Sequence, residues 1–119
     1  NAVRIPVGHW IFGPPYPYHW KYGETRFPFV EGVLRILDQA FDWAERHGLL
    51  ILLDLHAAPG CQNGFDNGGI KDIVDWPTKP EYIAYSLDVL ERLAEPGFMG
   101  APVAAILTRE RCDGYGANR

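Results

Sequence analysis

The sequence contains little of what marks three large classes of protein. Its 119 residues include only two cysteines, Cys61 and Cys112, which are too few for a disulfide framework and fit no zinc-site spacing. We therefore expect two unpaired thiols, with a link between chains as the alternative. The net charge is −4 and there is no basic stripe, so nucleic acid is not an expected partner. No apolar run reaches the roughly 18 residues that a membrane span needs, so a membrane is not expected either.

The chain also lacks an initiator methionine, and no signal peptide precedes its first strand-like segment. We expect a processed, trimmed or excised piece, which leaves the cellular compartment open. What the sequence does contain is typical of a globular protein, with 47% hydrophobic residues and no block of like charge. A length of 119 residues predicts one domain at most.

Three apolar segments are predicted to be strands. Alternation favours a strand at 2–7, and a run that is apolar on both faces favours a buried parallel strand at 49–55. A third short strand is expected at 102–107, after the Pro96-Gly97 pair has ended the preceding helix. The three segments are far enough apart to leave room for a helix between each pair.

Two helices are expected between these strands. Apolar residues recur at helical spacing over 29–47, and Gly48 is a plausible terminator. Thr78 and Glu81 have the spacing of a capping box and predict the start of the second helix. The apolar face of that second helix is expected to consist of Ile83, Leu87, Leu90 and Ala94.

This alternation predicts an α/β fold in which parallel strands are joined by right-handed crossovers. No glycine-rich phosphate loop follows the first or second strand, so we expect no nucleotide and no other cofactor. The long loops follow strand ends, as they do in barrel enzymes. We predict a partial TIM (β/α)8 barrel over 1–107, with about three parallel strands and two helices, and an irregular tail at 108–119. A complete barrel needs about 250 residues.

Two polar residues interrupt the apolar strand at 49–55. Asp54 and His56 are two positions apart, so both lie on one face of the strand. If the wholly apolar face meets the helices, these two side chains point into the barrel. Arg4 lies on the mixed face of the neighbouring strand, and a buried arginine needs a hydrogen-bonded partner. We predict an Arg4–Asp54 ion pair beneath a ligand pocket with His56 above it; the alternative is a structural pair that closes the barrel floor.

The histidines have more than one interpretation. His56 could be a satisfied core histidine, a hydrogen-bond donor to substrate or a metal ligand, but no second ligand lies at a useful spacing, so no metal is expected. His9 and His19 lie in an aromatic-rich loop at 8–28 and could reach a ligand. Exposure at the surface is the favoured interpretation for both.

Two loops have the composition of a sugar-binding surface. Trp10 and its aromatic neighbours in 8–28 can cover the C–H faces of a pyranose ring, and Phe65 can add an apolar wall. The second loop, 60–69, is dense in groups that can bind vicinal hydroxyls. These are Gln62, Asn63, Asp66 and Asn67. The alternative is a well-ordered turn whose polar side chains satisfy their own backbone.

The segments NAVRIPVGHW, at 1–10, and LLDLHAAPGCQNGFDNGG, at 52–69, resemble glycoside hydrolase family 5, and in particular its exo-β-1,3-glucanase branch. The resemblance covers roughly 1–106, which would correspond to the second through fourth strands of the family barrel. It implies a retaining β-glucosidase or β-glucanase that acts on glucans. Members of the family are often secreted.

The resemblance also implies roles for individual residues. The strand-end arginine of the family falls on Arg4 and its histidine after the third strand on His56, and both help to organise the catalytic centre. Phe65 matches a residue that can line an acceptor subsite. Asp66 and Asn67 match residues that hold hydroxyls of the terminal glucose.

The catalytic carboxylates are where this sequence departs from the family. Retaining hydrolysis needs two carboxyls about 5 Å apart, and the family acid/base belongs to an Asn-Glu-Pro sequence after the fourth strand. Here the corresponding segment is ILTRERCDGYG, in which Glu110 lies close to the expected position without that tripeptide. The catalytic candidates are therefore Glu110 with Asp54 or Asp66.

Three functions fit these observations. The first is a piece of a glycoside hydrolase, the second a non-catalytic carbohydrate binder, and the third a folded remnant that is stable only through self-association. Three strands leave two open sheet edges, and open edges pair with other chains. We therefore expect a homo-oligomer. The expected substrate is a β-glucan or an oligosaccharide.

Overall fold

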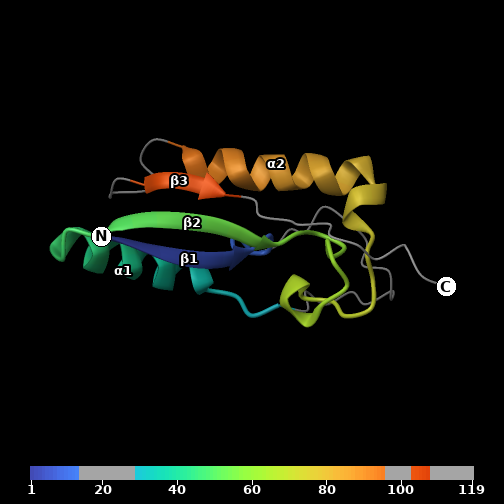
Figure 1. The fold of residues 1–119 in the computed structure, drawn as a ribbon, viewed down its shortest axis with the longest axis horizontal. Coiled ribbons are helices and arrows are strands. Elements are labelled where there is room, and N and C mark those ends of the chain that lie inside the picture. Colours follow the sequence, from blue (N-terminus) through green and yellow to red (C-terminus); the bar gives the residue numbers. More distant parts are fainter. Residues whose placement is uncertain (14–28, 96–102, 108–119) are drawn as a thin grey trace.

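A computed structural model of the chain describes residues 1–13, 29–95 and 103–107. For 103–107 it describes the backbone strand only. Most of the aromatic loop and the whole tail at 108–119, including Glu110 and Cys112, lie outside these residues. The described elements follow one another in the predicted order (Figure 1). They are β1 (Ala2–Gly8), α1 (Val33–Arg46), β2 (Leu50–Ala57), the 3-10 turns η1 (Asp66–Gly68) and η2 (Trp76–Thr78), α2 (Pro80–Ala94) and β3 (Val103–Leu107).

The strands form one sheet in the order β1-β2-β3, and both neighbouring pairs are parallel. This confirms the predicted α/β fold with parallel strands. Arg4 pairs with Leu52 and Pro6 with Asp54, so polar residues of β1 and β2 reach the same end of the sheet. The three arrowheads in Figure 1 point toward one end, and the segment containing η1 and η2 lies beyond it.

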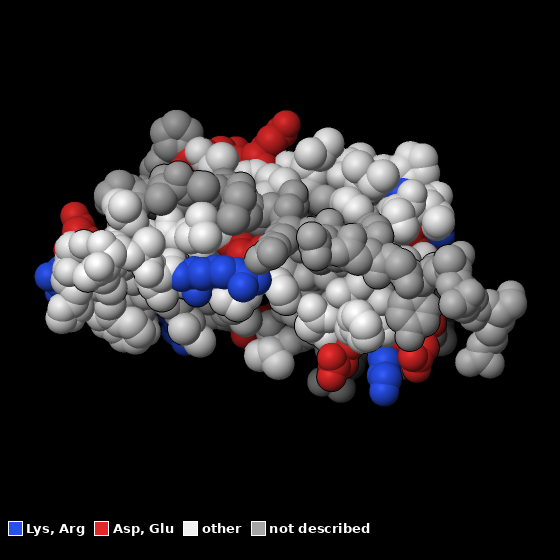
Figure 2. Space-filling view, viewed as in Figure 1, with Lys and Arg blue, Asp and Glu red and all other residues white. Residues whose placement is uncertain are grey.

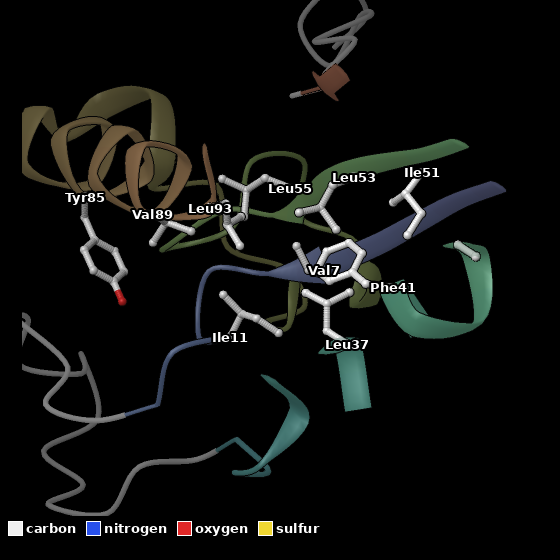
Figure 3. Packing of buried hydrophobic residues seen from close by; sticks show 11 residues of the cluster. Val7, Ile11, Leu37, Phe41, Ile51, Leu53, Leu55, Tyr85, Val89 and Leu93 are labelled. Carbon is white, nitrogen blue, oxygen red and sulfur yellow. The ribbon is translucent and has the colours of Figure 1, made fainter. Parts of the chain in front are cut away.

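The core lies on a single face of the sheet. Ile51, Leu53 and Leu55 alternate along β2 and are buried among side chains of both helices (Figure 3). Their alternation is what a strand produces when one face packs and the other does not. Since one cluster joins α1 and α2, both helices cover the same face, as expected if the wholly apolar face of β2 meets them. The helical members of the cluster are Leu37, Phe41, Ala44, Tyr85, Val89 and Leu93.

Helix α1 begins later in the chain than predicted, and it ends close to the predicted position. Its N-cap is Gly32, with a φ of 83°, so the helix starts at Val33 rather than at residue 29 as predicted. A left-handed residue interrupts helical geometry, and glycine adopts it without a Cβ penalty. At the other end, Gly48 has a φ of 63° and its N–H donates to the Glu45 carbonyl at 3.1 Å, as expected of a terminating glycine.

Two expectations for α2 are wrong. The predicted capping box does not form, because the Thr78 hydroxyl donates to the Asp75 carbonyl in η2 while Lys79 is the N-cap. The predicted apolar face is also displaced in part, since Ile83 is 38% and Leu87 56% exposed, whereas Leu90 is partly buried against the core as expected. The buried stripe consists instead of Tyr85, Ser86, Val89 and Leu93. Of the helices in the described residues, none is long and apolar enough to cross a bilayer.

Candidate active site

The candidate site begins with an ion pair on the face of the sheet that neither described helix covers, which we call the open face. The Arg4 guanidinium, on β1, donates from Nε to Asp54 Oδ2 at 2.8 Å and also from Nη2 to the same oxygen. The Asp54 side chain is 1% exposed and that of Arg4 48%. The predicted Arg4–Asp54 contact is therefore present, with the acid buried and the base half in solvent. Pro6 pairs with Asp54 across the two parallel strands. Arg4 lies two positions before Pro6, so its side chain is on the same face of the sheet as that of Asp54.

His56 lies next to this pair and is held at both ring nitrogens. Its Nδ1 is 3.1 Å from Asp54 Oδ2 and 3.1 Å from Arg4 Nη2. Its Nε2 is 3.1 Å from the amide Nδ2 of Asn67, in η1. The structure thus joins four of the residues singled out from sequence into one hydrogen-bonded group.

The two carboxylate oxygens of Asp54 differ in their hydrogen-bond partners. Oδ2 receives three neighbours, whereas Oδ1 is buried and has no hydrogen-bond partner among the described residues. An unpartnered carboxylate oxygen in a protein interior is costly. The Asp54 carboxylate is therefore supported from one side only in this part of the chain.

Gln62 does not have the exposed position that a sugar-binding residue needs. Its side chain is buried, with Nε2 donating to the His56 carbonyl at 2.8 Å and Oε1 accepting from the Ala58 N–H at 3.0 Å. Both ends of the amide are thus used to close the backbone after β2. For Gln62, the alternative of a well-ordered turn is therefore the right interpretation. No pattern in the sequence indicated that this side chain would hold the end of β2.

Asn63 also serves the loop itself, because its Oδ1 accepts the Phe65 N–H at 3.1 Å. This is an Asx-type turn, in which a side chain replaces a backbone acceptor. Cys61 is a buried free thiol beneath the turn. A Cβ at Gly68 would overlap the Cys61 sulfur, so a glycine is needed for η1 to approach this closely. The close approach places Asn67 within reach of His56.

Phe65 and Asp66 remain on the outer surface of this loop. The Phe65 ring is 56% exposed and Asp66 is also exposed, so both are accessible to a ligand. Figure 2, drawn from the same side as Figure 1, shows few charged groups among the described residues of this face, and its acidic and basic groups lie near one another. A surface of this kind suits a neutral hydroxyl-rich ligand better than a polyanion.

The residues after β1 form an aromatic cluster. The Trp10 ring stacks on Phe29 with centroids 4.0 Å apart and an interplanar angle of 5°, so one face of the indole is covered. His9 is 1% exposed, which corrects the expectation that it lies at the surface. Burial lowers the pKa of His9 to about 3, because the charged imidazolium loses its hydration there. His9 is therefore a neutral core residue, and His19 lies outside the described residues.

No group of three or more His, Cys, Asp or Glu side chains gathers in the part of the chain that the structure describes. The Arg4–Asp54–His56 group also has a guanidinium where a cation would have to bind. The arrangement can orient a polar ligand beside the Arg4 guanidinium.

The chain is similar to curated proteins named glucan 1,3-beta-glucosidase. The chain is 42% identical over 95 residues to "Probable glucan 1,3-beta-glucosidase A" of Aspergillus clavatus, which covers 80% of this chain and 20% of that protein. It is 42% identical over 91 residues to the Schwanniomyces occidentalis glucan 1,3-beta-glucosidase, covering 76% and 19%. It is 38% identical over 102 residues to that of Yarrowia lipolytica, covering 86% and 21%.

The chain therefore spans about a fifth of the length of the curated relatives it matches. No family model matches the chain. At about 40% identity over four-fifths of the chain, the similarity is to the glucan glucosidases as a group. The parts of those proteins that correspond to nothing in this chain are the larger share of their length.

Proposed function

We propose that the chain forms part of a β-glucan hydrolase and that its sugar-binding edge is built by Arg4 of β1, His56 near the carboxyl end of β2 and Asn67 of η1. The observation that carries this proposal is the hydrogen-bonded group of those residues with Asp54, on the open face of the sheet. The chain that carries this group is similar to glucan 1,3-beta-glucosidases over 80% of its length. Enzymes with parallel strands commonly keep their chemistry at this end of the sheet.

We further propose that the sheet is a segment of a (β/α)8 barrel of glycoside hydrolase family 5. Its strands follow one another in sequence order, and both helices pack on one face. A doubly wound sheet reverses its order and places helices on both faces, whereas a barrel does neither. Exposed apolar side chains at Ile36 and Trp43 of α1 and at Leu87 of α2 are the kind of surface that neighbouring helices of a barrel would cover.

Within this proposal the residues have different tasks. Arg4 and His56 orient the sugar, Asp66 and Asn67 lie near its hydroxyls, and Phe65 and Trp10 supply apolar contact. Asp54 acts as a positioning residue rather than a nucleophile, because its 1% exposed carboxylate already accepts from the guanidinium. Glu110 is the acid/base candidate in the chain, and the retaining reaction needs a second carboxyl about 5 Å away as nucleophile, for which Asp66 is the remaining candidate.

A carbohydrate-binding function without hydrolysis is the second candidate. The observation that favours it is the state of Asp54, the carboxylate at the centre of the site, which is buried against Arg4. In this function the chain holds a glucan through the exposed Phe65 and the loop amides and leaves the glycosidic bond intact.

Two measurements on the 119-residue chain separate these functions. Calorimetry with laminari-oligosaccharides is expected to detect binding under both proposals, and a chain that binds none contradicts both. Release of reducing sugar from laminarin, abolished by Glu110→Gln while calorimetric binding persists, is expected only of the hydrolase. Hydrolysis that is unchanged in Glu110→Gln would remove that residue from the mechanism.

We also propose that the 119-residue chain by itself forms a homo-oligomer. Val3 and Leu50 remain 38% and 44% exposed on the sheet, and β1 offers an unpaired backbone edge among the described strands. Such edges pair readily with other chains. Light scattering at low micromolar concentration is expected to give more than the mass of one chain, and a monomer contradicts this proposal.

A further inference from the structure

His56 has neighbours that make opposite demands on its ring. Nδ1 faces Asp54 Oδ2, which can only accept a hydrogen bond, and Arg4 Nη2, which can only donate one, both at 3.1 Å. A neutral imidazole carries its proton on either Nδ1 or Nε2. The contacts of both nitrogens together therefore select one tautomer.

The Asp54 side of the ring favours a proton on Nδ1. Arg4 already directs Nε and Nη2 to Asp54 Oδ2, and such charge-assisted bonds are the stronger ones. With Nδ1–H, the ring adds a third donor to that oxygen. With a bare Nδ1, two lone pairs would face each other at 3.1 Å.

The Asn67 side agrees with this assignment. Asn67 presents its amide Nδ2, a donor, to Nε2 at 3.1 Å, so Nε2 must be the acceptor. The opposite tautomer needs the Asn67 amide reversed as well as the Nδ1 contact with Asp54 lost. We propose that Asn67 is a positioning residue that, together with Asp54, holds His56 as the neutral Nδ1–H tautomer.

This arrangement leaves His56 without a spare ring nitrogen. Its Nδ1 serves Asp54, its Nε2 serves Asn67, and its carbonyl accepts from Gln62 at 2.8 Å. Two side-chain amides from one loop thus hold His56 at the end of β2: Asn67 contacts its ring and Gln62 its backbone carbonyl. In the glucan site, an inference that rests on the proposed function, these contacts set the position and the tautomer in which His56 works beside Arg4 to orient the sugar.

The test is nitrogen NMR of the imidazole groups in the ¹⁵N-histidine-labelled chain, in mildly alkaline buffer where histidine is neutral. The His56→Gln variant identifies the His56 signals by their loss. The wild type is expected to show a protonated Nδ1 and an unprotonated Nε2. A protonated Nε2 in the wild type overturns the proposal.

Two variants of the same loop test the role of Asn67. Asn67→Asp presents only acceptors to Nε2 and is expected to move the proton to Nε2. Asn63→Asp adds the same charge nearby but keeps an acceptor for the Phe65 N–H, so the tautomer is expected to stay unchanged. If both variants behave alike, the proposal fails.

A third variant keeps the proposal testable if Asn67→Asp does not fold. Asn67→Ala removes the donor, so the Nδ1–H form is expected to lose population to a mixture, and an unchanged tautomer overturns the role of Asn67. These NMR measurements are made on the chain without sugar. A correct tautomer in a chain that binds no laminari-oligosaccharide therefore contradicts the proposed function alone.

Discussion

The two faces of the sheet differ in what they do with the same strand. On one face of β2, Ile51 and Leu53 are 0% exposed and Leu55 4%, beneath α1 and α2. On the other face Leu50 is 44% exposed, and the strand continues into Asp54 and His56. The covered face contributes burial of apolar area, at about 25 cal/mol per Å².

The open face carries groups that a purely stabilising design would avoid. Asp54 is buried with one oxygen unpartnered among the described residues, next to a half-exposed Arg4. Buried ion pairs gain little net stability, because desolvation offsets much of the Coulombic attraction. The comparison indicates that stability comes from the helix side, and under the proposed function the open side is where the ligand binds.

The largest expected effect is on the covered face. Leu53→Ala is expected to lower the free energy of unfolding by about 2–5 kcal/mol, since it leaves a cavity among residues that cannot collapse fully. Urea denaturation measures the change. The matched control is Leu50→Ala, on the same strand but the opposite face, which is expected to cost clearly less. Equal losses would mean that the open face is also covered in solution.

The next effect is the pH dependence contributed by His9, which packs edge-on against Tyr85 of α2. Its pKa is about 3 when folded and 6.5 when exposed, so the unfolded chain binds the extra proton first. This contribution to stability is complete above pH 6.5 and is lost as the pH falls toward 3, by at most about 1.4 kcal/mol per pH unit.

Urea denaturation at a series of pH values checks this expectation. His9→Gln is expected to flatten the slope below pH 6.5, where the wild type loses stability through this group. His47→Gln, at the exposed C-cap of α1, is the control and is expected to keep the wild-type slope. A slope unaffected by His9→Gln would show that another group is responsible.

A smaller effect is expected for the ion pair of the open face. Arg4→Met leaves the Asp54 carboxylate buried without its cation and is expected to cost about 1–2 kcal/mol, less than a fully buried pair because Arg4 is half exposed. In Arg4→Met/Asp54→Leu no charge is left behind, so part of the loss is expected to return. A double variant that is as unstable as the sum of both single variants would rule out this coupling.

The smallest effect on stability is expected at Phe65. Its ring is 56% exposed, so Phe65→Ala is expected to change the free energy of unfolding by no more than about 0.5 kcal/mol. Under the proposed function the same variant binds laminari-oligosaccharides more weakly in calorimetry. Val74→Ala, at a residue that is 47% exposed, is the control and is expected to leave both quantities unchanged. Unchanged sugar affinity in Phe65→Ala would remove the ring from the binding surface.

Much of the fold follows from local patterns that the sequence displays. The alternation of apolar residues in β2 indicates which face packs, and the order of strands and helices indicates parallel pairing. Both are confirmed. The contact between Arg4 and Asp54 could be anticipated because a buried acid on one strand and an arginine on the next have few other partners. The tail with Glu110 stays a prediction.

Other features could not be read from local pattern. Helix α2 carries two overlapping apolar stripes, one through Ile83 and Leu87 and another through Tyr85, Val89 and Leu93. Helical periodicity is satisfied by either stripe. The second is buried because it packs in the core cluster with Leu53 and Leu55 of β2. The Tyr85 hydroxyl also donates to the His9 carbonyl, 76 positions away, at 3.2 Å.

The sequence by itself determined the order of strands and helices, the apolar face of β2 and the polar residues that follow it, because these depend on spacing along the chain. Only the tertiary structure decided that Gln62 turns inward, that Thr78 serves η2 instead of capping α2, and that Asn67 reaches His56. Each of these outcomes is a competition between hydrogen-bond partners. Its result depends on which groups the packed chain brings within about 3 Å of one another.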